Sequence, residues 1–483
     1  MIPAPKSHLF SDISFPPVDK LRFRRTDNVP DKVFDFIESE LGKYYRKMFG
    51  SVPDLDHGTL MISMFLQLGE TGKAESEEYH IGMIPGEIAL MAFTVNGLLH
   101  GMQTIRQIFR RAAYRDGEFI CQTIADRPSY PWRGLHLDVS RHFFDHKFVC
   151  RYLDWMAHVK LNKFHWHLSD DQGWRLESKI FPRLHEIGAW RKEADGSIYG
   201  GYYTQKQVRS VLDHASRLGI EVIPEIDVPG HAMAILAAYP HLACFPRDFQ
   251  PLNVWGISQD ILCAGQDEVV AFLKELFTEV AQLFPGRYVH LGGDEAPKER
   301  WKACPHCQKR IAKHQLANEE ELQGWLVKTL AKHLQGLDKT VIGWDEILDG
   351  KIDSKPIVMA WRGDGIDAAR IAHDNGNRYV ICPNNKLYFD WKPSDFKDVP
   401  GAHGITRIRD VYGLDLSKYK FERKKLFLGG QANLWTEYVP DNATAKDLVH
   451  DRLYALAEVF WSDPPDKDYE KFWRRSFDLA RFI

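Results

Sequence analysis

Beyond residue 130, short runs of β-branched and aromatic residues alternate with stretches that repeat apolar residues at helical spacing. The runs that predict strands number eight: 134–140, 163–170, 221–228, 288–295, 340–346, 356–362, 379–383 and 426–437. The stretches that predict helices include 146–160, 205–218, 268–284, 319–334, 366–373 and 443–461. Strands that alternate with helices predict a parallel sheet covered by helices. Eight such units are typical of a (β/α)8 TIM barrel with loop insertions.

The first 130 residues differ from the rest in composition, because all 14 tryptophans lie between Trp132 and Trp473. The segment 126–131 (DRPSYP) is rich in turn residues, and each proline disfavours helix in the residue before it. Upstream, 61–66 and 88–95 predict strands, 97–112 predicts a helix, and the polar segment 75–80 predicts a surface loop. We therefore expect an α+β accessory domain over 1–130 and the barrel over 131–483.

Charge and hydropathy exclude several classes of protein. Lys and Arg together number 63 and Asp and Glu 66, so the net charge of −3 lacks the basic footprint of a nucleic-acid-binding protein. No apolar stretch approaches the ~20 residues that cross a bilayer, so we expect no membrane span. Residues 1–30 lack the pattern of a secretory signal. We expect either a cytoplasmic protein or a secreted or periplasmic one whose signal was removed, and the sequence leaves the oligomeric state open.

The seven cysteines favour free thiols over a disulfide framework. Cys304-Pro-His-Cys307 is a lone C-x-x-C motif, which as a metal site needs two further ligands. Cys263 and His306 are candidates, and an incidental thiol pair is the alternative. The motif 165–167 (HWH) could also hold a metal, but alternate residues on a buried strand equally well pack a barrel. We expect neither a metal nor a cofactor, and leave the role of the C-x-x-C motif open.

Polar and aromatic residues follow all eight expected strands at their C-terminal ends, the face where this fold builds its active sites. They include Arg141, Asp170, Glu225, Asp227, His231, Asp294, Glu295, Trp344, Asp345, Glu346, Trp361, Tyr388, Asp390, Trp435 and Glu437. The sequence has no glycine-rich phosphate-binding motif. Carboxylates can accept hydrogen bonds from hydroxyls and act as acids or bases, while indoles cover apolar ring faces. This combination favours a sugar as substrate.

Four ordered motifs together resemble glycoside hydrolase family 20, the β-N-acetylhexosaminidases. They are 160–174 (KLNKFHWHLSDDQGW), 223–231 (IPEIDVPGH), 290–295 (HLGGDE) and 434–437 (LWTE). The resemblance runs from about residue 133 to 461, and the preceding domain resembles the accessory domain of that family. It implies an exo-acting, retaining enzyme that removes terminal N-acetyl-β-D-glucosamine or N-acetyl-β-D-galactosamine from glycans or oligosaccharides. In such an enzyme the acetamido oxygen of the substrate attacks C1 and gives an oxazolinium intermediate.

The resemblance implies a role for each residue at the reacting centre. Glu295 matches the general acid/base, and Asp294 matches the residue that orients and polarises the acetamido group. Asp170 and His231 match a hydrogen-bonded relay that contacts the acid/base. Tyr388 matches the tyrosine that donates a hydrogen bond to the acetamido carbonyl.

The remaining matched residues would hold the sugar. Three tryptophans match the indoles that enclose the acetamido methyl group and the sugar face: Trp344, Trp361 and Trp435. Three polar residues match those that bind the hydroxyls of the terminal sugar: Arg141, Asp390 and Glu437. Asp345 and Glu346 are candidates for supporting these groups.

Two alternatives remain open from the sequence. The first is a conventional two-carboxylate glycosidase with Glu437 or Glu346 as nucleophile, and the second is a carbohydrate-binding protein without catalysis. Asp294 and Glu295 are neighbours, and successive side chains of an extended chain point to opposite faces. The pair is therefore poorly suited to flank one bond as acid and nucleophile. Preference for glucosamine or galactosamine and the identity of the natural glycan are not readable from the sequence.

Overall fold

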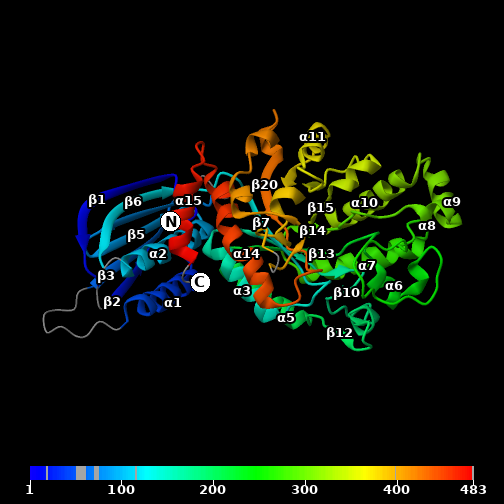
Figure 1. Ribbon diagram of the computed structural model, residues 1–483, viewed down its shortest axis with the longest axis horizontal. Helices are drawn as coiled ribbons and strands as arrows, with labels where there is room; N and C mark the ends of the chain where they lie inside the picture. The colour runs from blue at the N-terminus through cyan, green and yellow to red at the C-terminus, as the bar shows by residue number, and fades with distance from the viewer. Residues whose placement is uncertain (18–19, 51–60, 70–75, 115–116, 397–398, 481–483) are drawn as a thin grey trace.

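The computed structural model describes residues 1–483 except 18–19, 51–60, 70–75, 115–116, 397–398 and 481–483. Figure 1 shows an N-terminal domain, coloured blue to cyan, beside a larger barrel domain. No helix among the described residues combines the length and the apolar character that a membrane crossing requires. The domain boundary near residue 130 stays a prediction, and the change from β6 (Phe119–Asp126) to β7 (Trp132–Asp138) lies at that point.

The N-terminal domain is a six-stranded sheet packed against two helices, α1 (Asp31–Phe49) and α2 (Val95–Ala113). The strand order is β1-β6-β4-β5-β3-β2. The other strands are β1 (Ser7–Phe15), β2 (Lys20–Arg25), β3 (Met61–Leu68), β4 (Tyr79–Ile84) and β5 (Glu87–Ala92). In β5, Ile88, Leu90 and Ala92 alternate with more exposed neighbours and face the helices' apolar core, as a half-buried strand requires. This fold confirms the expected α+β class.

The predicted surface loop at 75–80 is only partly correct over the residues that the structure describes, because 76–78 lack regular structure but are half-buried, and 79–80 belong to β4. Tyr79 begins β4 and is fully buried. Glu77 accepts hydrogen bonds from both terminal nitrogens of Arg133, at 2.8 Å each. A charged side chain can be buried when an opposite charge is supplied in the right geometry. The polar composition of the segment could not reveal that this partner comes from the first barrel strand.

The second domain is a closed barrel of eight parallel strands, and every predicted strand is confirmed. The strands are β7, β8 (Lys163–His167), β13 (Glu221–Glu225), β14 (Tyr288–His290), β15 (Thr340–Trp344), β16 (Ile357–Ala360), β17 (Tyr379–Ile381) and β20 (Phe427–Ala432). The barrel closes where β20 pairs with β7. Most observed strands end earlier than predicted, because the polar residues that follow them leave the hydrogen-bonded ladder and turn over the barrel mouth.

The six predicted helices also form. They are α3 (His146–His158), α5 (Gln205–Arg217), α7 (Asp267–Leu283), α10 (Glu319–Gln335), α11 (Ile366–Asp374) and α14 (Asn442–Ala457), the last continued by a π-helical segment at Glu458–Ser462. Local sequence sets where they begin. The Asp145 side chain caps α3 by accepting from the Phe148 amide at 2.7 Å, and Thr204 with Gln207 forms a capping box on α5.

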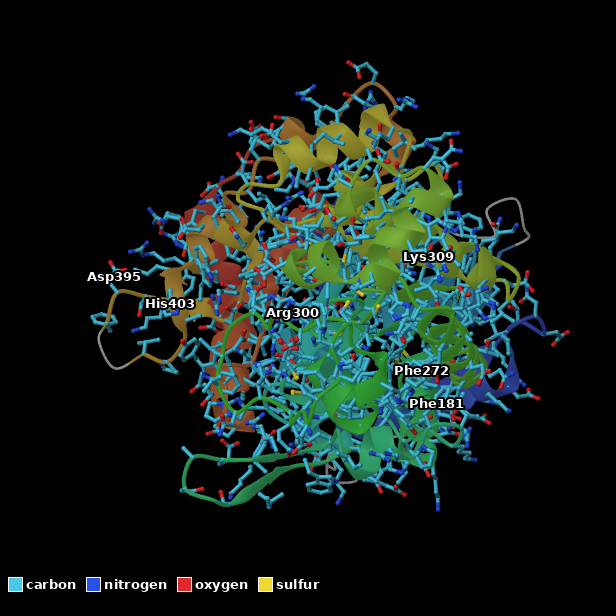
Figure 2. All side chains as sticks on the ribbon, turned by 90° about the vertical axis from the view of Figure 1, so that its right-hand side faces the viewer. Phe181, Phe272, Arg300, Lys309, Asp395 and His403 are labelled. Carbon is cyan, nitrogen blue, oxygen red and sulfur yellow. The ribbon has the colours of Figure 1, made fainter. Side chains whose placement is uncertain are left out.

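Two insertions stand beside the barrel mouth. One follows β13 and contains α6 (Met233–Ala238), and the other follows β14 and contains α8 (Glu299–Ala303) and α9 (Pro305–His314). The helices predicted from the sequence did not include α8 or α9. Figure 2 turns this side toward the viewer, with Arg300 of α8 near the middle and Lys309 of α9 on one side of it.

Candidate functional site

The residues that the sequence placed at the strand ends lie together at the C-terminal mouth of the barrel. Contacts between side chains connect them into one site. An ionic chain through Arg141, Asp170 and His231 reaches Asp294 and Glu295, and an aromatic group lies beside it. Eight parallel strands in a closed barrel direct all their carboxyl ends to the same face. The expected positions are therefore explained by the topology.

Asp170 is buried and lies between the two cations of the ionic chain, Arg141 and His231. One carboxylate oxygen of Asp170 accepts from His231 Nδ1 at 3.0 Å, and the other lies 2.9 Å from Arg141 Nη2. Burial alone would raise the pKa of Asp170, but Arg141 and His231 outweigh burial and hold that pKa well below its usual range. Burial likewise opposes the charge of His231, yet Asp170 raises the His231 pKa well above its usual value. His231 therefore carries a positive charge toward the next residues in the chain.

His231 contacts both neighbouring carboxyl groups. Its Nε2 lies 3.5 Å from Glu295 Oε2 and 3.8 Å from Asp294 Oδ2. Glu295 has a positive φ of 45°, which turns its side chain out of the extended path of the strand. The two adjacent carboxyl groups thus reach the same imidazole, although an extended chain would have pointed them to opposite faces.

The turn that positions Asp294 depends on glycine. Gly292 has a φ of 70°, and a Cβ atom there would lie only 1.7 Å from Asp227 Oδ1. That oxygen accepts a hydrogen bond from the Gly293 amide at 3.0 Å. Asp227 thereby fixes the backbone immediately before Asp294, and a larger residue at position 292 would displace it.

The surroundings of Asp294 disfavour its charged form. Burial, followed by the nearby charge of Asp227, raises the pKa of Asp294 well above its usual range. Burial also raises the pKa of Asp227 itself, to about 7. Among the described residues, Asp294 Oδ1 is buried without a hydrogen-bond partner. A buried acceptor of this kind is costly unless a ligand supplies a donor.

Four aromatic side chains form a continuous surface beside Asp294. The ring centroids of Trp344 and Trp435 are 5.8 Å apart, those of Trp435 and Tyr388 6.3 Å, and those of Tyr388 and Trp361 6.1 Å. Trp344 is buried and donates from Nε1 to Glu225 Oε1 at 2.8 Å. Such a surface can enclose a small apolar group such as a methyl and cover one face of a sugar ring.

The polar end of the site gathers Arg141, Glu437 and Asp390. Arg141 Nη2 lies 3.9 Å from Glu437 Oε1, and its guanidinium carbon lies 5.1 Å from the centre of the Trp435 ring. Burial, followed by the charge of Glu437, raises the pKa of Asp390 well above its usual range. Asp390 Oδ1 is a second buried oxygen without a hydrogen-bond partner in the described part of the chain. This end of the site can accept hydrogen bonds from several hydroxyl groups.

A buried polar network lies under the mouth of the barrel around Glu225, a strand-end residue to which the sequence gave no role. Glu225, the last residue of β13, receives a hydrogen bond from His167 and has His165 Nε2 and His290 Nδ1 each at 3.0 Å. Burial would raise the pKa of Glu225, but His167 outweighs it and holds that pKa well below its usual range. The signal available in the sequence was a carboxylate, Glu225, between the apolar residues Pro224 and Ile226 of a predicted strand. Burial opposes the charge of His167, but Glu225 raises the His167 pKa well above its usual value, so His167 balances the charge of Glu225. Burial lowers the pKa of His165 to about 4, so His165 contributes packing and not charge.

Asp345 and Glu346, the candidates for supporting residues, both contact Trp361 of the aromatic surface. Asp345 Oδ2 accepts from the Trp361 amide at 2.8 Å, and Glu346 Oε2 accepts from Trp361 Nε1 at 2.9 Å. Burial and then the charge of Asp294 raise the pKa of Glu346 to about 9. Glu346 is thus a neutral carboxyl near pH 7 that holds an indole.

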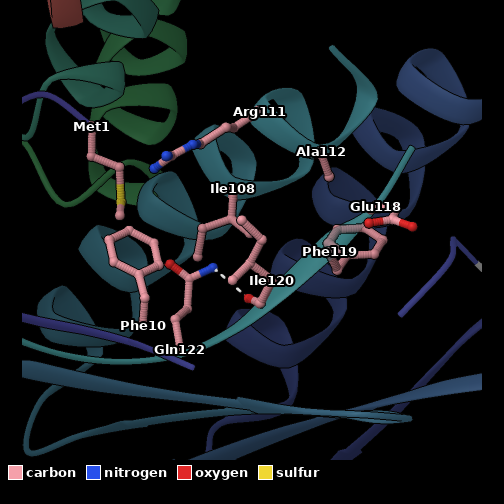
Figure 3. A pocket seen from close by; sticks show the side chains of 9 residues that line it. All are labelled: Met1, Phe10, Ile108, Arg111, Ala112, Glu118, Phe119, Ile120 and Gln122. Carbon is pink, nitrogen blue, oxygen red and sulfur yellow. Dashed lines mark hydrogen bonds between the residues drawn. The ribbon is translucent and has the colours of Figure 1, made fainter. Parts of the chain in front are cut away.

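The N-terminal domain contains a small cavity of about 20 Å³ between α2 and β6 (Figure 3). This volume is room for about one water molecule. The lining is mainly apolar, and Gln122 Nε2 within it donates to the Ile120 carbonyl at 3.1 Å. The cavity lacks the paired carboxylates and indoles of the barrel mouth, so we place the candidate site at the barrel.

Two family models match consecutive parts of the chain. "Glycosyl hydrolase family 20, domain 2" matches residues 1–127, and "Glycosyl hydrolase family 20, catalytic domain" matches residues 130–464. The chain belongs to glycosyl hydrolase family 20. The resemblance found in the four sequence motifs is thereby confirmed.

Curated relatives and solved structures of family 20 match over most of the chain. A β-hexosaminidase of Porphyromonas gingivalis is 43% identical over 80% of this chain, which spans only 51% of that protein. A β-hexosaminidase of Akkermansia muciniphila is 32% identical over 86% of this chain and 85% of its own length. The crystal structure of an exo-β-N-acetylglucosaminidase of Vibrio harveyi with N-acetylglucosamine superposes with a TM-score of 0.86 at 26% identity, covering 100% of this chain and 76% of the other.

Proposed function

We propose that this family 20 chain is an exo-acting β-N-acetylhexosaminidase that works through substrate assistance. It would remove terminal, non-reducing N-acetyl-β-D-glucosamine or N-acetyl-β-D-galactosamine from glycans or oligosaccharides, with retention of configuration. The observation that carries the proposal is the pair of adjacent carboxyl groups at one imidazole, His231, with the free oxygen of Asp294 beside an aromatic surface. The names of the relatives, β-hexosaminidase and exo-β-N-acetylglucosaminidase, agree with it.

In the first step, the acetamido oxygen would attack C1 while Glu295 donates its proton to the glycosidic oxygen. The bond between C1 and that oxygen breaks, and an oxazolinium forms. Asp294 would accept a hydrogen bond from the acetamido nitrogen and balance its developing positive charge. In the second step, water attacks C1 and gives its proton to Glu295, which restores the acid.

The surrounding residues would position the substrate for these steps. Tyr388 would donate a hydrogen bond to the acetamido carbonyl, within a cage formed by three indoles: Trp344, Trp361 and Trp435. Arg141, Asp390 and Glu437 would bind the hydroxyls of the terminal sugar, and their charges close that end of the site. Binding of these hydroxyls would make the bound sugar the non-reducing end of the glycan, as exo action requires.

The two alternatives are less well supported. Glu346 is a poor nucleophile near pH 7 because its raised pKa of about 9 keeps it protonated and because it accepts a hydrogen bond from Trp361. Glu437 faces the cation of Arg141 at 3.9 Å, which suits hydroxyl binding. A binding protein without catalysis would have no use for the strained turn that brings Glu295 to His231.

One experiment separates all three functions. We would assay 4-nitrophenyl N-acetyl-β-D-glucosaminide beside the unacetylated β-D-glucoside, and follow the first-formed sugar by proton NMR. Substrate assistance predicts cleavage of the acetamido substrate alone, with the β-anomer formed first. Equal cleavage of both, or trapping of a glycosyl ester on a protein carboxylate, would support the conventional mechanism. No cleavage of either would support a binding protein.

A further inference from the structure

Four buried cysteines from three separate segments meet behind the site, between the two insertions. Cys244 follows the short turn Pro240–Leu242, Cys263 precedes α7, and Cys304 and Cys307 begin α9. The sulfur of Cys263 lies 3.6 Å from that of Cys304 and 3.7 Å from that of Cys307, and the sulfurs of Cys244 and Cys307 are 3.8 Å apart. All four sulfurs lie within 4.8 Å of one another.

These separations match the edges of a metal-centred tetrahedron. Four thiolates bound to Zn²⁺ at about 2.3 Å in tetrahedral geometry have sulfur atoms about 3.8 Å apart. A disulfide would require a separation of about 2.05 Å. All seven cysteines are free thiols in the structure. The four sulfurs are thus arranged around a common centre and are not paired in two bonds.

The burial of the cluster also favours a cation. All four cysteines are buried, and their sulfur atoms lie within 4.8 Å of one another. More than one thiolate in so small a buried volume repel each other unless a cation lies between them.

The backbone around the cluster is fitted to bring the two insertions together. A Cβ atom on Gly265 would lie 2.2 Å from the backbone nitrogen of Cys307, so only glycine allows this approach. The amide of Cys263 donates to the Leu242 carbonyl at 2.9 Å, next to a β-bridge between Ala243 and Leu262. Cys304 is the N-cap residue of α9, where the helix dipole favours a thiolate.

We propose that Cys244, Cys263, Cys304 and Cys307 bind one structural Zn²⁺ ion. Binding would release the thiol protons and fill all four positions with sulfur, which leaves none open for a substrate or for water. This proposal replaces our expectation that the chain holds no metal. The sequence offered Cys263 as a third ligand but not Cys244.

The ion would connect two walls of the candidate site. The insertion that carries Cys244 and Cys263 begins at His231, and the insertion that carries the C-x-x-C motif begins directly after Glu295. Zn²⁺ would therefore fix the distance between the imidazole and the acid/base from behind. Its role would be positional, and the proposal holds whether or not the proposed activity is found.

The decisive test is the metal content of the full-length protein. Protein purified without chelators, or exposed to Zn²⁺ and then desalted, should hold one zinc per chain by elemental mass spectrometry. Replacement by Co²⁺ should give the intense visible and charge-transfer bands of tetrahedral thiolate coordination. Wild-type protein that retains no zinc after reconstitution, that contains iron in its place, or that has disulfides among these four cysteines by mass spectrometry would overturn the proposal.

Variants locate the ion. Cys304→Ser combined with Cys307→Ser should lose the zinc and unfold at a lower temperature, whereas the control Cys150→Ser, at a partly exposed cysteine of α3, should keep both. Zinc retained by the double variant would place the ion elsewhere and contradict the assignment. If the double variant does not fold, the cobalt spectrum and zinc content of the wild type still decide.

Discussion

Two buried charge networks, one between the domains and one at the mouth of the barrel, use the same residue types but are satisfied differently. Between the domains, Arg133 donates to both oxygens of Glu77, and Lys160 donates to Tyr79 at 2.7 Å and to Asp126 at 3.1 Å. At the mouth, three buried carboxylate oxygens lack a partner in the described part of the chain. They belong to Asp227, Asp294 and Asp390.

The difference separates a network built for stability from one built for a ligand. A complete network offsets the cost of burying its charges, whereas an incomplete one leaves that cost in the folded protein. Raised pKa values at Asp294 and Asp390 express the same cost. A substrate with hydroxyl and amide donors would complete the second network. Mutations in the two networks should therefore affect different properties.

The largest effect should come from Glu295→Gln. We expect kcat on an N-acetylglucosamine disaccharide to fall by ~10²–10⁴-fold, because a general acid is lost at constant volume. The loss should be smaller with a nitrophenol leaving group, which needs a proton less. Melting should hardly change, because the Glu295 side chain is 37% exposed. Glu299→Gln, at a side chain 64% exposed beyond the same strand, is the control. Unchanged turnover of the disaccharide would exclude Glu295 as the acid.

Asp294→Asn tests the unsatisfied oxygen directly. The substitution removes the charge that would balance the oxazolinium, so kcat should fall by ~10²–10³-fold. Stability should stay the same or rise, since a desolvated carboxylate beside Asp227 is replaced by a neutral amide. Steady-state kinetics and thermal melting measure both quantities. A variant that lost stability and kept its activity would place Asp294 in the stabilising class of network.

Glu77→Gln tests the complete network and should leave the kinetics unchanged. Removing one partner of a buried ion pair should lower the free energy of unfolding by roughly 3 kcal/mol. Glu78→Gln is the control, because Glu78 pairs with His80 near the surface. Denaturant unfolding of the three proteins measures the difference.

The pH dependence of this loss has a definite sign. Burial would raise the pKa of Glu77, but Arg133 outweighs it and holds that pKa well below its usual value. The stabilisation is therefore complete above the unfolded pKa of about 4.3 and is lost as the pH falls through the folded pKa. The gap between wild type and Glu77→Gln should be constant near pH 7 and shrink in strong acid. A gap that grows in acid would contradict the pairing.

The two networks also show which features could be predicted from the sequence and which could not. Strands and helices were predictable because their patterns are local, and the strand ends followed from the topology of the barrel. The partners of Glu225 come from β8, β14 and β15, which only the closed barrel brings together. Glu77 was predicted to lie in a surface loop because its partner is distant in sequence. Cys244 was missed because no regular spacing connects it to the C-x-x-C motif.

The smallest effect should be a shift in pH dependence from His231→Asn. The imidazolium 3.8 Å from Asp294 lowers the pKa of that carboxyl against the effect of burial. Asparagine can keep the hydrogen bond to Asp170 and tolerates the positive φ of 48° at this position, but it carries no charge. The pKa of Asp294 in the free enzyme should rise, so the acid limb of kcat/KM should move to higher pH, by about one unit. Because the limb reports the position of the titration, a general loss of rate does not obscure it. An acid limb at the wild-type pH would show that the ionisation of Asp294 does not set it. Asp390, the other raised carboxyl of the incomplete network, would then be the candidate.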